Sequence, residues 1–291
     1  MSTDQTDLSL ETALRQLVED KTRVLCGGTD YYPALNDALP DRRLLNVRRV
    51  AGLDSLSQID GHWRIGAAVT WSALINATLP PCFNCLKQAG REVGSVQIQN
   101  AATLVGNVCN ASPAADGVPA LLVLDAQVEL SSVDGARVIP LAEFIVGVRK
   151  TSRTDNELVT ALLIPNTHNT DHTDFVKLGS RTYLVISIVM CAVRIRLNAT
   201  KTITDAAICV GACSPVACRL PALEQALVGL PCESEVLRNC VIAEHLDALA
   251  PITDVRATAE YRIQAAQVLL QRQISAFAQQ VSTVEAPTAQ L

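Results

Sequence analysis

The sequence predicts an α+β fold in two parts, and three observations predict it. Apolar residues at helical spacing alternate with short apolar segments over the first 165 residues, which is typical of mixed helices and strands. A polar stretch without apolar side chains follows at 166–174. Beyond it, strand candidates come first and helical patterns come last, as in α+β proteins.

The N-terminal segment is expected to form a helix, a strand, a glycine turn, a second helix and a second strand. Apolar residues recur at helical spacing from Leu10 to Val18, directly after Ser9, a residue type that caps helices. The further elements expected here are a strand at 23–26, a turn at 27–30, a short helix at 33–39 and a strand at 44–47.

The middle of the chain begins with a hairpin signal, Asp60-Gly61, between strand candidates. Thr70 is expected to cap a helix that begins near Trp71. Residues 94–116 are rich in Gly, Asn, Ser and Ala with little periodicity, so we expect a long loop with a binding role. The other elements expected here are a helix at 83–93 and strands at 53–59, 63–67, 127–131, 137–139 and 158–164.

The polar stretch at 166–174 is the expected linker, and His168 and His172 within it are expected to be solvated. It divides the chain into a domain at 1–170, with subdomains at about 1–52 and 53–170, and a C-terminal domain at 171–281. Residues 282–291 are expected to be disordered. The C-terminal elements expected are strands at 175–178, 188–197 and 206–211 and helices at 220–228, 233–249 and 255–279.

Composition excludes several classes of protein. The formal net charge is −5 and no basic stripe is present, which argues against a nucleic-acid-binding protein. The N-terminus lacks the pattern of a secretory signal, and no run of 18 apolar residues occurs, so we expect a cytoplasmic protein without a membrane span. The sequence motifs of Walker loops, dinucleotide-binding Rossmann folds, serine hydrolases and zinc proteases are also missing.

The ten cysteines are expected to be reduced, because disulfides are rare in cytosolic proteins. Their spacing does not match a four-thiolate iron–sulfur or zinc site, so no metal site is assigned. Most are expected to be small buried side chains. Cys82 and Cys85 form a lone CxxC, for which a redox or metal pair stays open as the alternative.

Two segments carry residues suited to ligand binding. In Leu25–Asp30, a strand runs into Gly27 and Gly28, whose backbone can approach a ligand closely and can bind a pyrophosphate through its N–H groups. In 100–116, small residues would let a flat ligand lie against the backbone, and Asp116 is suited to accept from ribose hydroxyls. Taken alone, either segment is also compatible with an ordinary turn or a tightly packed irregular stretch.

Several motifs occur in a familiar order: CGGTD at 26–30, ATLVGNVCNASPAADGVPALLVLDA at 102–126 and FVKLGSRT at 175–182. With IDGHWRIGAAVT at 59–70 and DVRATAEYRIQAAQVLL at 254–270, they resemble the FAD-binding subunit, or middle domain, of the xanthine dehydrogenase and carbon-monoxide dehydrogenase family. The resemblance implies a two-subdomain FAD-binding fold of the p-cresol methylhydroxylase and vanillyl-alcohol oxidase type. A smaller α/β C-terminal domain with an antiparallel sheet would follow it.

The resemblance further implies the flavin subunit of a molybdenum hydroxylase. Electrons would come from molybdopterin on a large subunit through [2Fe–2S] clusters on a small subunit to FAD on this chain. They would continue to NAD+, oxygen or a quinone, in a dimer of heterotrimers. Lys177 near the flavin would stabilise its reduced, anionic form. No catalytic residue is assigned, and the implied cofactor-binding residues are Leu25, Cys26, Gly27, Gly28, Thr29, Asp30, Tyr31, Ala102, Thr103, Leu104, Val105, Gly106, Asn107, Ser112, Pro113, Ala115, Asp116, Val159 and Lys177.

The sequence departs from the family pattern at Val105, where the family has a second glycine, and also at Gln99 and Val185. A β-branched residue resists positive φ angles, so Val105 predicts a changed loop or weaker FAD binding. One alternative is therefore a degenerate, non-catalytic assembly subunit with weak or no FAD. Another is a stand-alone FAD oxidoreductase of the same fold.

Overall fold

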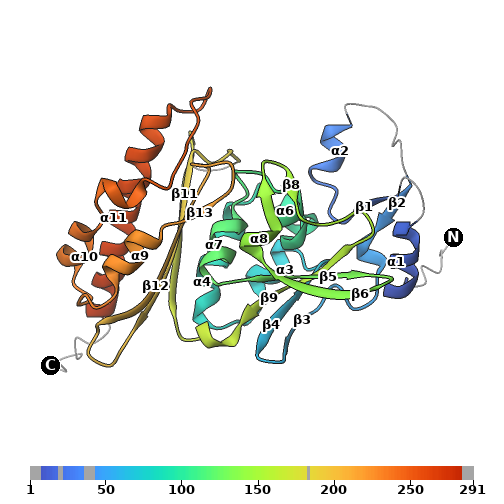
Figure 1. Ribbon diagram of the computed structural model, residues 1–291, viewed down its shortest axis with the longest axis horizontal. Coiled ribbons are helices and arrows are strands. Elements are labelled where there is room, and N and C mark those ends of the chain that lie inside the picture. Colours follow the sequence, from blue (N-terminus) through green and yellow to red (C-terminus); the bar gives the residue numbers. More distant parts are fainter. Residues whose placement is uncertain (1–7, 19–21, 36–42, 182–183, 284–291) are drawn as a thin grey trace.

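The structure is a computed structural model and describes residues 8–18, 22–35, 43–181 and 184–283 of the 291-residue chain. The N-terminal elements lie at one end of its long axis and the C-terminal helices lie at the other (Figure 1). None of the described helices combines the length and the apolar composition that crossing a bilayer requires.

The N-terminal elements follow the predicted order. Helix α1 starts after Ser9, whose Oγ accepts a hydrogen bond from the backbone N–H of Thr12 at 3.2 Å. Strands β1 and β2 pair in parallel. Helix α2 begins at Tyr31, before the predicted start at 33, and the residues predicted to end it lie outside the described part. The bounds are α1 (Leu10–Val18), β1 (Arg23–Leu25), α2 (Tyr31–Ala34), β2 (Leu44–Asn46) and the 3-10 helix η1 (Val47–Arg49).

A five-stranded antiparallel sheet forms the centre of the N-terminal half, in the order β3-β4-β9-β5-β6. The predicted hairpin at Asp60-Gly61 is confirmed, with both residues at positive φ, 45° and 77°. β9 at the centre of the sheet is apolar along nearly its whole length because both of its faces are buried. The strands are β3 (Leu56–Ile59), β4 (His62–Gly66), β5 (Gln127–Ser132), β6 (Gly135–Pro140) and β9 (Leu158–Pro165).

The expectation of a long loop at 94–116 was wrong, because two short helices, α5 and α6, occupy most of it. Each starts at its own hydroxyl cap: Ser95 accepts from Ile98 N at 3.4 Å, and Thr103 accepts from Gly106 N at 3.0 Å. Helices this short span too few turns to show an apolar periodicity. The remaining elements here are α3 (Trp71–Asn76), η2 (Pro81–Phe83), α4 (Asn84–Glu92), α5 (Val96–Ala101), α6 (Leu104–Asn110), α7 (Gly117–Val123), α8 (Leu141–Phe144), β7 (Ile145–Gly147) and β8 (Lys150–Thr151).

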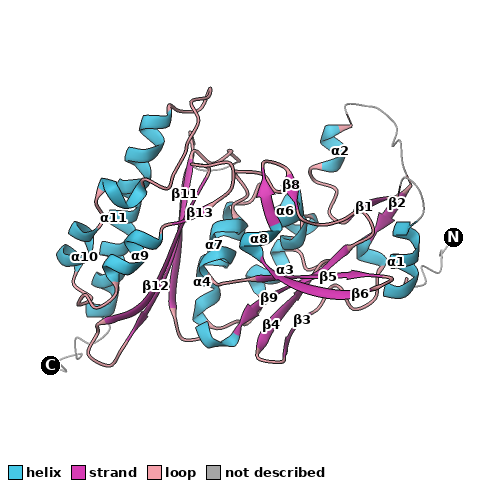
Figure 2. Cartoon of the chain, in the orientation of Figure 1, coloured by secondary structure: helices cyan, strands magenta, loops and turns pink. Residues whose placement is uncertain are grey.

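The C-terminal half contains a four-stranded antiparallel sheet in the order β10-β11-β12-β13. Helices α9, α10 and α11 lie on one side of it, and α4 and α7 of the N-terminal half lie on the other (Figures 1 and 2). The bounds are η3 (Asn166–His168), β10 (His172–Leu178), β11 (Val189–Leu197), β12 (Ile203–Gly211), β13 (Cys218–Arg219), α9 (Pro221–Leu227), α10 (Ser234–Cys240), η4 (Ala243–Leu246) and α11 (Ala259–Thr283).

Two predicted C-terminal helices differ in their ends. The helix expected at 233–249 stops at Cys240, since the β-branched pair Val241 and Ile242 disfavours helix and the Val241 carbonyl instead accepts from two glutamines of α11. Helix α11 starts after Thr258, which accepts from Tyr261 N at 3.1 Å, rather than at 255. The tail at 282–291 was expected to be disordered, but α11 continues through residues 282 and 283, so the prediction was wrong there; residues 284–291 lie outside the described part.

The hydrophobic core has two clusters that share the C-terminal sheet. Alternate residues of β11 point to opposite faces: Met190 and Ala192 join the N-terminal cluster, whereas Cys191 and Val193 join the C-terminal one. Both faces of this sheet are therefore buried, which explains why its strands are nearly continuous apolar runs in the sequence.

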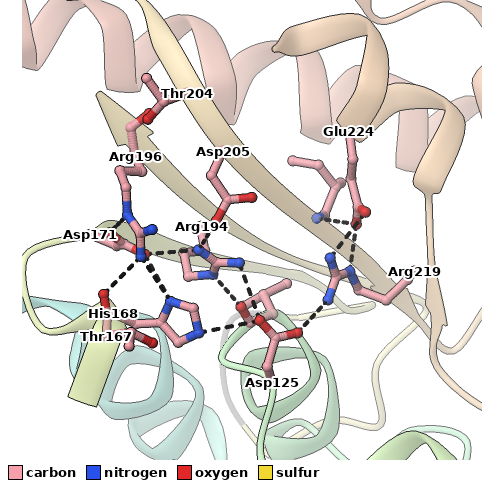
Figure 3. A network of polar contacts seen from close by, with 12 residues as sticks. Asp125, Thr167, His168, Asp171, Arg194, Arg196, Thr204, Asp205, Arg219 and Glu224 are labelled. Atoms are coloured by element: carbon pink, nitrogen blue, oxygen red, sulfur yellow. Dashed lines mark hydrogen bonds and ion pairs between the residues drawn. The ribbon is translucent and has the colours of Figure 1, made fainter. Parts of the chain in front are cut away.

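The segment 166–174 is not the solvated linker that its polarity predicts. His168 is 7% exposed and Asp171 is 1% exposed. Arg194 and Arg196, on the same face of β11, both donate to Asp171, at 2.8 Å and 2.7 Å (Figure 3). The prediction for His168 was wrong because these arginines, distant in sequence, create a buried polar site; His172 is exposed as expected.

The same network continues across the two halves through Asp125, the residue after α7 and its C-cap. His168 and Arg219 both contact Asp125, at 3.2 Å and 3.0 Å, and Arg219 also pairs with Glu224 of α9 at 2.5 Å (Figure 3). Burial alone would raise the pKa of Asp171, but hydrogen bonds from His168, Arg196 and Arg194 outweigh it and hold that pKa well below its usual range. Ion pairs of Asp125 and Asp171 with His168, Arg194 and Arg219 therefore connect the N-terminal half to the C-terminal sheet.

Most cysteines are buried, as predicted, but Cys109 is exposed. Cys82 and Cys85 are both fully buried, and burial raises the pKa of each thiol to about 12. Thiols with such a pKa are unreactive near neutral pH. Among the described residues, no group of His, Cys, Asp and Glu is arranged to hold a metal ion.

Candidate functional site

The loop after β1 depends on its two glycines for different reasons. Gly28 has a φ of +71°, a conformation that L side chains rarely adopt. A Cβ at Gly27 would instead lie 2.4 Å from the carbonyl oxygen of Ala101 and 2.8 Å from the Cα of Ala102. Gly27 therefore lets the loop touch the backbone at the end of α5, and the two sequence-distant segments meet.

A cavity of about 1010 Å³ opens where these two segments meet. This is the size of a large cofactor pocket. It is lined by the whole predicted loop from Leu25 to Tyr31, by Val159 of β9 and by part of the second predicted segment. The residues of that segment in the lining are Ala102, Thr103, Val105, Gly106 and Asn107.

Three polar atoms in this lining are buried and have no hydrogen-bond partner among the described residues. They are the hydroxyl groups of Thr22 and Tyr31 and the indole Nε1 of Trp71. Buried polar groups are nearly always hydrogen-bonded in folded proteins. Such unpaired atoms around one cavity indicate that a polar ligand completes the site.

Val105 lies within α6, is 4% exposed and has an ordinary helical conformation. The expected conflict between a β-branched side chain and a positive φ angle is therefore absent at this position. Gly106, the next residue, is exposed at the cavity, and its N–H is held by Thr103. The helix geometry thus removes the physical reason for which Val105 pointed to a degenerate subunit.

Six predicted binding residues do not line the cavity. Leu104 is fully buried in the core. Lys177 of β10 donates to the carboxylate of Asp116 at 2.7 Å, and Ser187 donates to its other oxygen at 2.6 Å. Burial raises the pKa of Asp116, and the Lys177 ammonium opposes that shift. The residues outside the cavity lining are Leu104, Ser112, Pro113, Ala115, Asp116 and Lys177.

Sequence reasoning missed the three arginines of the lining, of which Arg23 belongs to β1. Arg149 and Arg153, from the segment between β7 and β9, both line the cavity. Arg149 has a φ of 56°, and its N–H donates to the carbonyl of Ala111 at 2.9 Å while its side chain bonds to Asn110. No sequence signal marks a positive φ at an arginine, so only the fold reveals this pair of positive charges.

Family models match both halves of the chain. Residues 6–167 match the FAD binding domain in molybdopterin dehydrogenase, and residues 174–277 match the CO dehydrogenase flavoprotein C-terminal domain. The xanthine dehydrogenase FAD-binding subunit of Escherichia coli O157:H7 is 28% identical over 275 residues, with 92% of each chain covered. The carbon monoxide dehydrogenase medium chain of Afipia carboxidovorans is 29% identical, with 90% of each chain covered.

Solved structures with the same fold include quinoline 2-oxidoreductase from Pseudomonas putida 86. The TM-score is 0.83 at 24% sequence identity, covering 93% of this chain and 94% of that one. The mixed α/β fold with antiparallel sheets is therefore shared with that enzyme over almost the whole chain.

Proposed function

Because this chain belongs to the family of FAD-binding domains of molybdopterin dehydrogenases, we propose that it relays electrons through FAD within a larger oxidoreductase. FAD supplies the redox chemistry when bound, and the protein supplies position and electrostatics. The observation that carries the proposal is the contact between Gly27 and the Ala101–Ala102 backbone, because it brings the two predicted loops to one cavity.

The lining of the cavity fits FAD. The glycine loop and the start of α6 would hold the diphosphate, with Arg149 and Arg153 supplying positive charge beside it. The unpaired hydroxyl groups of Thr22 and Tyr31, two partly exposed residues, would bond to the polar groups of the cofactor. Asp116, Lys177 and their neighbours would contact FAD only if the Asp116–Lys177 pair opened toward it, which is a separate part of the proposal.

The remaining expectations from the family resemblance belong to the same proposal. The fold would be of the p-cresol methylhydroxylase and vanillyl-alcohol oxidase type, with domains at 1–170 and 171–281, which the two core clusters and the two matched ranges support. A large molybdopterin subunit and a small [2Fe–2S] subunit would complete a cytoplasmic dimer of heterotrimers. The electrons would leave FAD for NAD+, oxygen or a quinone.

FAD reconstitution tests the binding part of this proposal. The purified chain, incubated with FAD and then passed through a desalting column, is expected to stay yellow with a flavin absorption spectrum. FMN, which lacks the adenylate, is the matched ligand and is expected to be retained less. A folded preparation that remains colourless after incubation with FAD would overturn the assignment.

The relay is tested separately in the assembled complex. Tagged chain is purified from its own cells, and molybdenum, iron and flavin are quantified together with the copurifying proteins. We expect all three in fixed proportion, and flavin reduction when the oxidisable substrate is added. Flavin that is reduced without any metal-containing partner would favour the stand-alone oxidoreductase instead.

A further inference from the structure

A second cavity, of about 370 Å³, shares no residue with the FAD cavity. It runs between α4 and α11, beside the first residues of β10, which is an edge strand of the C-terminal sheet. The lining residues recur at three- and four-residue spacing along each helix, which places them on one face of that helix. We call it the α4–α11 groove. Its polar residues from the two helices are Asn84, Lys87, Gln88, Arg91, Gln273 and Gln280, and His172, Thr173 and Asp174 line it from β10.

Gln273 is the most unusual residue of the groove. Its side chain is only 4% exposed, yet neither its Nε2 nor its Oε1 has a hydrogen-bond partner within the described residues. A primary amide can donate two hydrogen bonds and accept two, and leaving them unmade in a buried position is costly. The amide therefore calls for a ligand that offers a donor and an acceptor side by side.

Gln88 and Thr173, two other polar residues of the groove, already form hydrogen bonds within the protein. Gln88 donates to Asp174 at 2.8 Å and accepts from the backbone N–H of Phe175 at 2.9 Å. Thr173 donates to the carbonyl of Cys82 at 2.9 Å. Since Gln88 already covers the edge of β10, an added β-strand is not the way in which a ligand would bind here.

The charge of the groove is positive. Lys87 and Arg91 lie one turn apart on α4, and Lys87 spends one of its three N–H groups on the carbonyl of Ala77. Asp174 is the one carboxylate in the lining, and Gln88 occupies one of its oxygens. The groove therefore has two cationic side chains, Lys87 and Arg91, and one carboxylate, Asp174, that already accepts a hydrogen bond from Gln88.

We propose that the α4–α11 groove docks an acidic polypeptide segment of a partner chain. A backbone amide of that segment matches Gln273, because a peptide group offers a donor and an acceptor together, and acidic side chains match Lys87 and Arg91. The groove joins α4, which packs in the N-terminal core cluster, to α11 of the C-terminal cluster, so the segment would contact both halves. The inference does not depend on FAD binding.

Fluorescence anisotropy at low salt tests the proposal on the full-length chain. The probe is a labelled peptide of alternating glutamate and glycine, acetylated and amidated at its ends. The matched peptide with glutamine in place of glutamate is expected to bind at least about tenfold more weakly. Free glutamate is expected not to compete in the concentration range where the peptide binds.

Three variants locate the binding. Gln273→Leu and Arg91→Glu are each expected to weaken peptide binding at least about tenfold. Arg272→Glu makes the same charge change on an exposed residue of α11 outside the groove and is expected to leave binding within about twofold. FAD retention is measured in parallel and is expected to be unchanged in all three, so a failure here is distinguishable from a failure of the flavin assignment.

Gln273→Leu also has a readout that does not involve the peptide. If the amide is unpaired in the free chain, replacing it by an apolar side chain of similar size leaves the melting temperature equal or higher. A lower melting temperature, equal peptide affinity in all variants, or equal affinity for the glutamine peptide would each overturn the proposal. Competition by free glutamate at the peptide's own concentration would make the groove a small-carboxylate site and overturn it as well.

Discussion

A Cβ at Gly27 would lie 2.4 Å from a backbone oxygen of α5, so the loop or α5 would have to shift, and the cavity proposed to hold FAD opens where these two segments meet. We therefore expect Gly27→Ala to lower the affinity for FAD at least about tenfold, which corresponds to about 1.4 kcal/mol. Equilibrium dialysis of the apoprotein with FAD measures this change.

Gly147→Ala is the matched control. Gly147 has no positive φ, and the nearest atom to an added Cβ is 3.9 Å away, at ordinary van der Waals distance. This variant is expected to bind FAD like the unmodified chain. If both variants lost FAD equally, or Gly27→Ala lost none, the close approach of the two segments would not be what forms the site.

Val105→Gly is expected to destabilise the protein without improving FAD binding. Val105 is buried and helical, so the change removes a buried side chain and places glycine in a helix, at a cost of about 3 kcal/mol in the free energy of unfolding. Urea unfolding and FAD titration measure the two effects. A large gain in FAD affinity would instead restore the interpretation of a degenerate site.

Among the helices, α6 is positioned by its cap, since Thr103 is 2% exposed and its hydroxyl accepts from the N–H of Gly106 at 3.0 Å. We expect Thr103→Ala to cost about 1 kcal/mol in the free energy of unfolding. Thr103→Ser keeps the hydroxyl and is expected to retain most of that stability. Thermal unfolding of both variants checks this, and equal losses would show that the methyl group, rather than the cap, matters.

Caps also explain which elements the sequence could predict. Ser9 and Thr70 precede visible apolar patterns, and the helices that follow them were predicted at the right place. Ser95 and Thr103 cap helices of only two turns, where no periodicity can develop, so the same residue type was not recognised as a start. The glycine loop was predictable because its local sequence dictates its backbone, whereas the positive φ of Arg149 is imposed by packing.

At the scale of the whole molecule, the division into two domains stays a prediction, whereas the sequence misjudged the segment expected to link them. Polarity at 166–174 predicted solvent exposure, whereas His168 and Asp171 are buried against Arg194 and Arg196. Local composition could not reveal this, because the partners lie more than 20 residues further along the chain. The same limit applies to the Asp116–Lys177 pair, whose members are 61 residues apart.

The charged network that links the two halves through Asp125 and Asp171 should make the stability of the protein depend on pH. Burial would lower the pKa of His168, but hydrogen bonds to Asp125 and Asp171 outweigh it and raise that pKa above the ordinary 6.5. Because the pKa of His168 is higher in the folded than in the unfolded state, protonated His168 stabilises the folded protein fully below pH 6.5. This stabilisation is lost as the pH rises through the folded-state pKa. We expect the melting temperature to fall from pH 6.5 upwards more steeply than in His168→Gln, and parallel profiles would contradict this.

Loss of the Asp171 carboxylate should lower the free energy of unfolding more than loss of any exposed carboxylate of the network. It is 1% exposed and holds two arginines, so Asp171→Asn leaves the buried Arg194 guanidinium without its buried counter-charge, at a cost of about 3 kcal/mol. Asp205→Asn removes a carboxylate 2.6 Å from the same guanidinium, but its side chain is 40% exposed, so water can replace it and the cost should stay below about 1 kcal/mol. Calorimetry compares the melting temperatures of the two variants. Because both core clusters include residues of the same sheet, each variant is expected to unfold in a single transition. Equal melting temperatures for the two would show that burial of Asp171 does not strengthen the network.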